Sequence, residues 1–215
     1  MKKTANKKVL KKSGTPKKAD GFKKEPSFGN TNPRVGNAGS GAPKVAIIAE
    51  LLVKMGGAER VVKKFAEMYP EAPIYTLLYD EEKCGKDFPA ARVRSSFLQK
   101  FPRFLRKRYR WFLGLMPYAI ETLDLSEFDL VISSSSAFAH GALTSSECRH
   151  VCYCHSPMRF AWDYTHQYLE EKWFNFLTRW IASRALEKIR IWDKIAADRP
   201  DDYLVNSRHV QQRVE

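Results

Sequence analysis

The sequence Lys44-Val-Ala-Ile-Ile-Ala-Glu50, followed by Met55-Gly-Gly-Ala-Glu-Arg60, decides the fold class. The first stretch is a short, nearly continuous apolar run, which is typical of a strand buried on both faces. The glycine pair then allows a tight turn. The apolar residues after it recur at helical spacing: Val61, Val62, Phe65, Ala66 and Met68. The pattern therefore predicts a strand, a glycine-rich turn and a helix, the opening unit of an α/β fold.

The same alternation continues along the chain. We expect further strands at residues 73–78, 91–95, 128–133, 150–154 and 202–206, and helices at residues 98–116, 168–197 and from Ser207 onward. Alternating strands and helices indicate a parallel sheet that is covered by helices on both faces. The sequence therefore predicts a Rossmann-like α/β domain at residues 44–215.

Residues 1–43 differ in composition from this domain. They carry eleven Lys and Arg residues against two acidic residues, and few large apolar side chains. Such a segment cannot bury enough surface to offset the entropy of ordering it, so we expect a disordered basic tail. The tail is either an electrostatic tether to anionic lipid or nucleic acid, or a solvated extension without a specific role.

The net charge of +13 over 215 residues is therefore unevenly distributed. Residues 44–215 hold 26 basic and 22 acidic residues, so bulk charge does not make the folded part a nucleic-acid binder. No apolar run has the length of a transmembrane helix, and no apolar stretch follows the N-terminal lysines as in a secretory signal. Four cysteines without an export signal favour reduced thiols, so we expect a cytoplasmic protein.

The turn at Gly56 and Gly57 is the first candidate binding site. Backbone N–H groups at a helix start form a site for anions, and phosphate is their natural ligand. Arg60 lies in the first turn of the helix, where it either helps to neutralise phosphate or is an exposed helix residue. The pattern Gly-x-Gly-x-x-Gly is missing from this turn, which counts against an ordinary dinucleotide site.

The second candidate is the stretch Cys152-Tyr-Cys-His-Ser-Pro-Met-Arg-Phe-Ala-Trp-Asp163. His155 follows the carboxyl end of a strand, where ligands bind in open α/β sheets, so it either hydrogen-bonds a hydroxyl or phosphate or caps a loop. A metal site is the rival interpretation, because Cys148, His150, Cys152 and Cys154 lie nearby. Ligands from one extended strand cannot close a tetrahedron, so we expect no metal and buried free thiols.

Residues 101–116 separate apolar from basic side chains when projected as a helix. One broad face would hold Phe101, Phe104, Leu105, Trp111, Phe112, Leu115 and Met116, and the opposite arc Arg103, Arg106, Lys107 and Arg110. Such a helix fits an anionic membrane surface, and we expect the basic arc and Trp111 to contact it. The alternative is a core-packed helix with a solvated basic face.

Five segments, taken in order, resemble the N-terminal domain of GT-B glycosyltransferases of family GT4. They are K-V-A-I-I-A-E (44–50), G-G-A-E-R (56–60), F-D-L-V-I-S-S-S-S-A-F-A-H-G (128–141), C-Y-C-H-S-P-M-R-F-A-W-D (152–163) and D-Y-L-V-N-S-R-H-V (202–210). The similarity is greatest to bacterial mannosyltransferase-like members that build cell-surface polysaccharides. It implies two Rossmann-like domains across a cleft, with the acceptor on the first and most of the nucleotide sugar on the second. The reaction would retain anomeric configuration and need no metal or other cofactor.

The resemblance also implies roles for individual residues. The amides of Gly56 and Gly57 would face the donor diphosphate, and His155 would approach the transferred sugar and be needed for transfer. The remaining matches are acceptor-side candidates (Ser134, Ser135, Ser136 and Arg159) and cleft-border candidates (Asn206 and Ser207). The segment at 101–116 lies where such enzymes touch the membrane to reach lipid-linked acceptors, so we expect a peripheral protein on the inner face of the cell membrane.

The family's donor-binding domain, with its Glu-x7-Glu element, does not follow within these 215 residues. We expect a truncated enzyme, a fragment or one half of a split pair, inactive without the donor domain. The expected function is acceptor binding in a retaining glycosyltransferase that moves a hexose, with mannose as the suggested sugar, from a nucleotide sugar to a glycan or lipid-linked glycan. The alternative is a non-catalytic membrane-docking or interaction module with the same fold.

Overall fold

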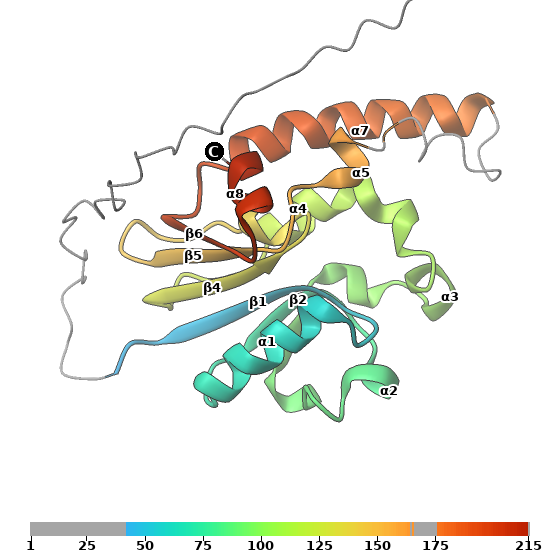
Figure 1. Ribbon diagram of the computed structural model, residues 1–215. Helices are drawn as coiled ribbons and strands as arrows, with labels where there is room; N and C mark the ends of the chain where they lie inside the picture. Colours follow the sequence, from blue (N-terminus) through green and yellow to red (C-terminus); the bar gives the residue numbers. More distant parts are fainter. Residues whose placement is uncertain (1–41, 164, 166–175, 215) are drawn as a thin grey trace, which may run out of the picture. The chain divides into compact units, whose positions relative to one another are not determined.

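The computed structural model describes residues 42–163, 165 and 176–214, and within them a single parallel sheet (Figure 1). Its strands are ordered β3-β2-β1-β4-β5-β6. Their bounds are β1 Val45–Leu52, β2 Ile74–Tyr79, β3 Val93–Ser95, β4 Leu130–Ser135, β5 Arg149–Cys154 and β6 Asp202–Val205. The expected Rossmann-like sheet is therefore confirmed. The expected tail at residues 1–43 lies, apart from its last two residues, outside the described residues.

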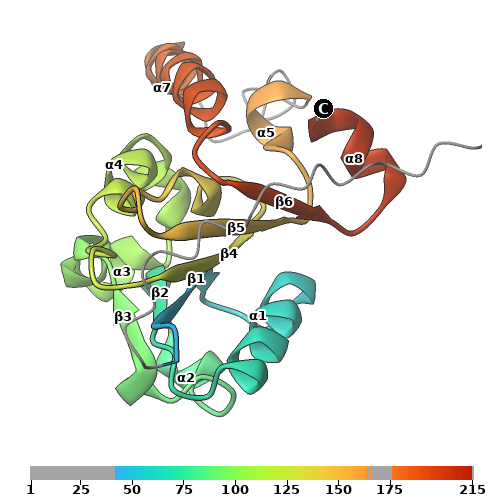
Figure 2. The ribbon, with the colours of Figure 1, turned by 90° about the vertical axis from the view of Figure 1, so that its left-hand side faces the viewer.

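Helices cover both faces of the sheet (Figure 2). Their bounds are α1 Gly57–Met68, α2 Glu81–Cys84, α4 Met116–Glu121, α5 Arg159–Trp162, α7 Phe176–Ala196 and α8 Arg208–Val214. Residues 168–175 of the expected long helix lie outside the described residues, and α7 accounts for the remainder. Of the two faces, one is covered by α1, and the other by α4 and α7.

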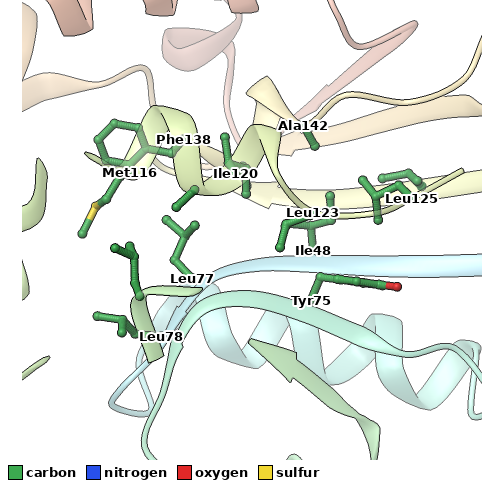
Figure 3. Packing of buried hydrophobic residues seen from close by; sticks show 14 of the residues in the cluster. Ile48, Tyr75, Leu77, Leu78, Met116, Ile120, Leu123, Leu125, Phe138 and Ala142 are labelled. Atoms are coloured by element: carbon green, nitrogen blue, oxygen red, sulfur yellow. The ribbon is translucent and has the colours of Figure 1, made fainter. Parts of the chain in front are cut away.

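The alternation of side chains along β1 builds a core on each face. Ile47 and Ala49 pack with Val62 of α1, whereas Ile48 points to the other face. There it joins a larger cluster to which α4 contributes Met116 and Ile120, and α7 contributes Leu186 and Ile189. Figure 3 shows Ile48 in this second core, close to residues of β2 and α4. Because β1 is buried on both faces, its sequence reads as an almost continuous apolar run.

The strand order reverses direction at β1, which pairs with β2 on one side and β4 on the other. The connection that follows β1 and the connection that follows β4 pass over opposite faces of the sheet. The space between the carboxyl ends of these two strands is therefore a topological switch point, where α/β sheets bind ligands. Ala49 of β1 is in register with Ser134 of β4, which places the serine run beside the glycine turn after β1.

The single helix expected at residues 98–116 is wrong. The structure has short helical pieces instead: the 3₁₀ helix η2 (Phe97–Lys100), α3 (Arg103–Arg106) and the 3₁₀ helix η3 (Tyr109–Leu115), which runs into α4. Pro102 is one physical reason, because it lacks an N–H group and holds Phe101 in an extended conformation.

The single apolar face expected for this segment is wrong as well. Phe104 and Trp111 are 68% and 69% exposed, whereas Met116 is buried. The chain turns at Lys107 and Arg108 between α3 and η3, so side chains before and after this turn do not follow one helical period. The basic residues consequently do not form one continuous arc.

Candidate functional site

A small cavity of about 100 Å³ marks the switch point between β1 and β4. It lies where the ends of both strands meet the first turn of α1. Its lining comes from the end of β1 and the turn after it, from α1, from η3 and from the end of β4: Ala49, Glu50, Leu51, Val53, Lys54, Ala58, Glu59, Val62, Tyr109, Ser134 and Ser136. The fold therefore brings the glycine turn and the serine run, 77 residues apart between Gly57 and Ser134, to one place.

The carboxylate of Glu59 lies at the glycine turn. Gly56 caps α1, and its N–H group donates a hydrogen bond of 2.9 Å to Oε2 of Glu59. A Cβ atom on Gly56 would lie 2.8 Å from the same oxygen, whereas one on Gly57 would meet nothing within 4 Å. Arg60 is exposed and lines neither the small cavity nor the larger one described below. The N–H group of Gly56 thus has an oxygen acceptor within the protein, and the binding of phosphate at this turn stays a prediction.

His155 lies directly after β5 and reaches the small cavity through Ser134. Its Nε2 atom is 2.8 Å from Oγ of Ser134, and its ring packs against Tyr153 with ring centroids 4.9 Å apart. Burial lowers the pKa of His155 below its usual value of 6.5, and the charge of Glu59 opposes this. The imidazole is therefore mostly neutral near pH 7, with one nitrogen able to accept a proton.

Three consecutive serines at the end of β4 contact three different histidines. Because side chains alternate along a strand, Ser134 faces α1, whereas Ser133 and Ser135 face α4 and α7. Oγ of Ser133 is 2.8 Å from Nε2 of His150, and Oγ of Ser135 is 3.2 Å from Nδ1 of His140. The structure thus separates the expected acceptor-side serines: Ser134 and Ser136 line the small cavity, and Ser135 is buried on the other face.

Glu50, which sequence reasoning missed, organises the loop after β4. Its carboxylate accepts hydrogen bonds from the backbone amides of Ser136, Ala137, Phe138 and Ala139. Burial raises the pKa of this carboxyl above its usual value, and the amides and the charge of His140 oppose the rise. Glu50 ends the strand that opens the fold, so its position at the ligand-binding edge was a signal in the sequence.

The chain of contacts continues from Glu50 to α7. Oγ of Ser135 is 3.5 Å from Oε1 of Glu50, and Nε2 of His140 is 3.3 Å from Oδ1 of Asp193. Asp193 also accepts a hydrogen bond from the indole of Trp162 in α5, at 2.7 Å. We call Glu50, Ser135, His140 and Asp193 the buried network. Its members come from β1, β4, the loop after β4 and α7, so it fixes α7 to the ligand-binding edge of the sheet.

The predicted site residues after His155 do not line the small cavity. Arg159 is exposed at the start of α5, and Asn206 is exposed after β6. Ser207 caps α8 as expected, because its Oγ accepts a hydrogen bond from the amide of Val210 at 3.3 Å. None of the three lines either of the cavities described here.

A larger cavity of about 490 Å³ lies next to the small one, at the ends of β1 and β2. We call it the basic cavity. It is lined by the turn after β1, by the end of β2, by α2 and by η2, α3 and the residues after it: Val53, Lys54, Leu78, Tyr79, Asp80, Glu81, Glu82, Lys83, Gln99, Arg103, Arg106, Lys107 and Tyr109. Val53, Lys54 and Tyr109 line both cavities. Three bases that we expected at the membrane, Arg103, Arg106 and Lys107, therefore lie around a cavity.

Within the described residues, no group of three or more His, Cys, Asp or Glu side chains is arranged to hold a metal ion. All four cysteines are buried and free, as expected. None of the helices that the structure describes has both the length and the apolar character needed to cross a bilayer.

The profile of Glycosyltransferase Family 4 matches residues 55–215, which is well over half of the chain. The chain belongs to glycosyltransferase family 4. The matched range begins at the glycine turn and includes His155 and the serine run, so the family resemblance seen in the sequence is confirmed. Searches of curated proteins and of solved structures gave no significant match. The parallel sheet of this family 4 domain is consistent with one half of a GT-B fold.

Proposed function

We propose that this family 4 domain binds the acceptor in a retaining glycosyltransferase. The enzyme would transfer a hexose, with mannose as the first sugar to test, from a nucleotide sugar to a glycan or lipid-linked glycan of a cell-surface polysaccharide. The observation that carries the proposal is the contact of His155 with Ser134, which lines a small cavity together with the first turn of α1, in a chain of family 4. We further propose that a second, donor-binding domain completes the site and that the protein acts at the cytoplasmic face of the membrane.

Each part of the proposed site would have a separate role in transfer. The amides at Gly56 and Gly57 would bind the donor diphosphate, which then competes with the Glu59 carboxylate for the Gly56 N–H group. The neutral imidazole of His155, oriented by Ser134, would hydrogen-bond a hydroxyl of the transferred sugar or of the acceptor. Because amides and basic side chains supply the positive potential, we expect transfer without an added metal ion.

The test is an assay of transfer by the chain expressed with any sequence that follows residue 215 in its gene. A panel of nucleotide sugars is supplied with a glycan acceptor, and the anomeric configuration of the product is read by NMR. We expect retention, and we expect His155→Ala to lower the rate by about 100-fold or more, the range of a positioned acid–base group. His209→Ala, on the exposed surface of α8, is the matched control. Equal rates for both variants, or an inverted product, would contradict the proposal.

A second candidate function, a non-catalytic module that docks on an anionic membrane, has its own supporting observation. Trp111 and Phe104 are exposed, and the guanidinium of Arg108 lies 5.0 Å from the ring centre of Trp111. Exposed aromatic rings beside basic groups are typical of a surface that inserts into a lipid interface. Flotation with neutral and anionic liposomes tests it: we expect retention on anionic liposomes only, and Trp111→Ala to reduce it. Equal retention on both liposomes excludes electrostatic docking.

A further inference from the structure

The basic cavity has the size and the charge of an unfilled binding site. Its volume of about 490 Å³ lies within the range of small-molecule sites, roughly 300–1,000 Å³. It opens at the carboxyl ends of two parallel strands, the edge at which α/β sheets bind ligands. Ser134 and Ser136 line the small cavity and not the basic cavity, whereas Lys54 and Tyr109 line both, so the basic cavity adjoins the site of the proposed transfer.

Most acidic side chains around the cavity are already neutralised. Asp80 pairs with Lys83 at 3.0 Å, and Glu82 pairs with Arg103. Burial raises the pKa of Asp80, but the hydrogen bonds and charge of Lys83 and the charge of Arg103 together more than offset this, and the pKa lies below its usual value. Both carboxylates therefore have a basic partner, and Glu81 remains as the further acidic group of the lining.

Three basic side chains of the lining have no such partner. Within the described part of the chain, no hydrogen bond or ion pair involves the side chains of Lys54, Arg106 or Lys107. The Nε atom of Arg106 is buried and lacks an acceptor, although the residue as a whole is only half-buried. A buried donor without an acceptor destabilises the folded state, so an anion that accepts a hydrogen bond from Nε of Arg106 would be favoured at this position.

The balance of charge favours one class of anion. The three unpaired cations and Glu81 leave an excess of two positive charges in the cavity. A phosphate monoester carries about −1.5 to −2 charges near pH 7 and offers oxygens to an Arg fork, whereas a carboxylate carries one charge. Phosphate therefore matches the cavity in both charge and geometry.

The position of the cavity indicates which molecule carries the phosphate. Lys54 and Tyr109 line both cavities, so a ligand with its phosphate beside Arg106 extends past them toward Ser134 and His155. The glycine turn, at the start of α1, is the place proposed for the donor diphosphate. We infer that the basic cavity binds a phosphate group of the acceptor, held by Arg106 together with Lys54 and Lys107. The identity of the molecule as acceptor rests on the proposed function, whereas the binding of phosphate does not.

Calorimetric titration of the chain tests the inference without any donor. The probes are inorganic pyrophosphate and a water-soluble sugar 1-phosphate, at constant ionic strength, with the unphosphorylated sugar as reference. We expect both phosphates to bind and the sugar not to bind. Arg106→Gln should weaken binding by about tenfold or more, since a hydrogen bond to a charged group contributes about 1.5–3 kcal/mol. The control Arg94→Gln removes the same charge from β3, outside the cavity, and should change affinity by less than about twofold.

A second measurement separates ligand binding from a structural role of Arg106. Without ligand, Arg106→Gln should unfold at the same temperature as the parent chain or higher, because it removes an unsatisfied buried donor. With pyrophosphate, the parent chain should gain thermal stability by mass action and the variant should not. A variant that is destabilised without ligand and gains as much as the parent would overturn the inference. Arg106→Lys keeps the charge without the fork and should fall between the two.

Vesicles distinguish a soluble phosphate from the head of a lipid. The chain is floated with phosphatidylcholine vesicles that contain a minor fraction of phosphatidic acid, with and without Arg106→Gln. If the acceptor phosphate belongs to a lipid, Arg106→Gln should reduce flotation, and pyrophosphate should compete. If it belongs to a soluble acceptor, sugar 1-phosphate should bind while flotation is unaffected by the substitution.

Equal binding of every phosphate probe by Arg106→Gln and the parent chain overturns the inference, whether or not transfer occurs. Phosphate binding without transfer leaves it standing and contradicts the proposed function alone.

Discussion

The side chains of the buried network have hydrogen-bond partners within the protein. In the basic cavity, by contrast, Lys54, Arg106 and Lys107 have no hydrogen-bond or ion-pair partner among the described residues. Glu50 accepts hydrogen bonds from four backbone amides. Asp193 contacts Nε2 of His140 and accepts a hydrogen bond from the indole of Trp162. Both clusters lie at the same edge of the same sheet. The difference indicates two roles for polar residues at this edge. Side chains whose hydrogen bonds are made within the protein stabilise the fold, and side chains without partners are available to bind a ligand.

The most direct way to break this comparison is Glu50→Ala. Removing the carboxylate leaves four amides of the loop after β4 without an acceptor, each worth about 1–3 kcal/mol when buried. Partial hydration from the small cavity offsets part of this, so we expect a loss of about 4 kcal/mol in the free energy of unfolding. Urea denaturation measures it. Glu50→Gln, which keeps one acceptor oxygen, should lose less, and a loss below about 1 kcal/mol for Glu50→Ala would show that the network does not hold the loop.

The pH dependence of stability sharpens the comparison next. Burial and the charge of His140 lower the pKa of His150 from 6.5 to about 4, although Asp201 opposes the shift. As the pH falls from 6.5 to 4, the unfolded chain gains a proton on His150 and the folded chain resists it, so stability decreases by about 3 kcal/mol.

His150→Gln should remove most of this pH-dependent loss, whatever it does to stability at pH 7. The measurement is urea denaturation at several pH values between 4 and 7. His209→Gln, on the exposed surface of α8, should keep the slope of the parent chain. If both variants show the parent slope, His150 is not a buried neutral group.

A smaller effect is expected from Gly141→Ala, in the loop that carries His140. A Cβ atom at Gly141 would lie 2.2 Å from the ring of Trp192, which is itself fixed by a hydrogen bond of 2.7 Å to Glu121. Ring or backbone must move, at a cost of about 2 kcal/mol in the free energy of unfolding. Gly57→Ala is the control, because its Cβ meets nothing within 4 Å and should stabilise α1 by about 0.5 kcal/mol. The opposite order of stabilities would mean that the loop is loosely packed.

The smallest effect on stability is expected in the basic cavity. Lys54→Ala and Lys107→Ala remove side chains that are exposed and make no hydrogen bond or ion pair with the described residues. Their urea midpoints should equal that of the parent chain within error, while their affinity for pyrophosphate decreases. A marked loss of stability would assign these lysines to the fold and remove the contrast between the two clusters.

Local patterns predicted much of this protein. All six strands were expected near their observed positions, five of them from apolar stretches and β3 from the weaker pattern at residues 91–95, and Ser207 was recognised as the start of α8. The edge rule for α/β sheets brought out the glycine turn and His155, and the same rule applied to the end of β1 would have added Glu50. These features depend on residues that are close in sequence or on a general property of parallel sheets.

Residues 97–121 show where this approach fails. A period of 3.6 residues was assumed across Pro102 and the turn at Lys107 and Arg108, and the structure replaces that helix by α3, two 3₁₀ helices and α4. The intrinsic preferences of such short pieces are weak, so packing against the rest of the domain sets their direction. For this reason the sequence placed Arg106 on a membrane face, and the structure places it at a cavity.

The sequence by itself determined the family and the parallel α/β class, and it singled out the glycine turn and His155 as candidates, because each depends on short-range patterns. Only the tertiary structure decided which partners the serines of β4 take and which bases surround a cavity. Both depend on distant segments brought together by the strand order: His140, His150 and His155 contact serines of β4, and Lys54 and Arg106 line one cavity. Contacts of this kind arise when the two cores pack against the sheet, and no local period encodes them.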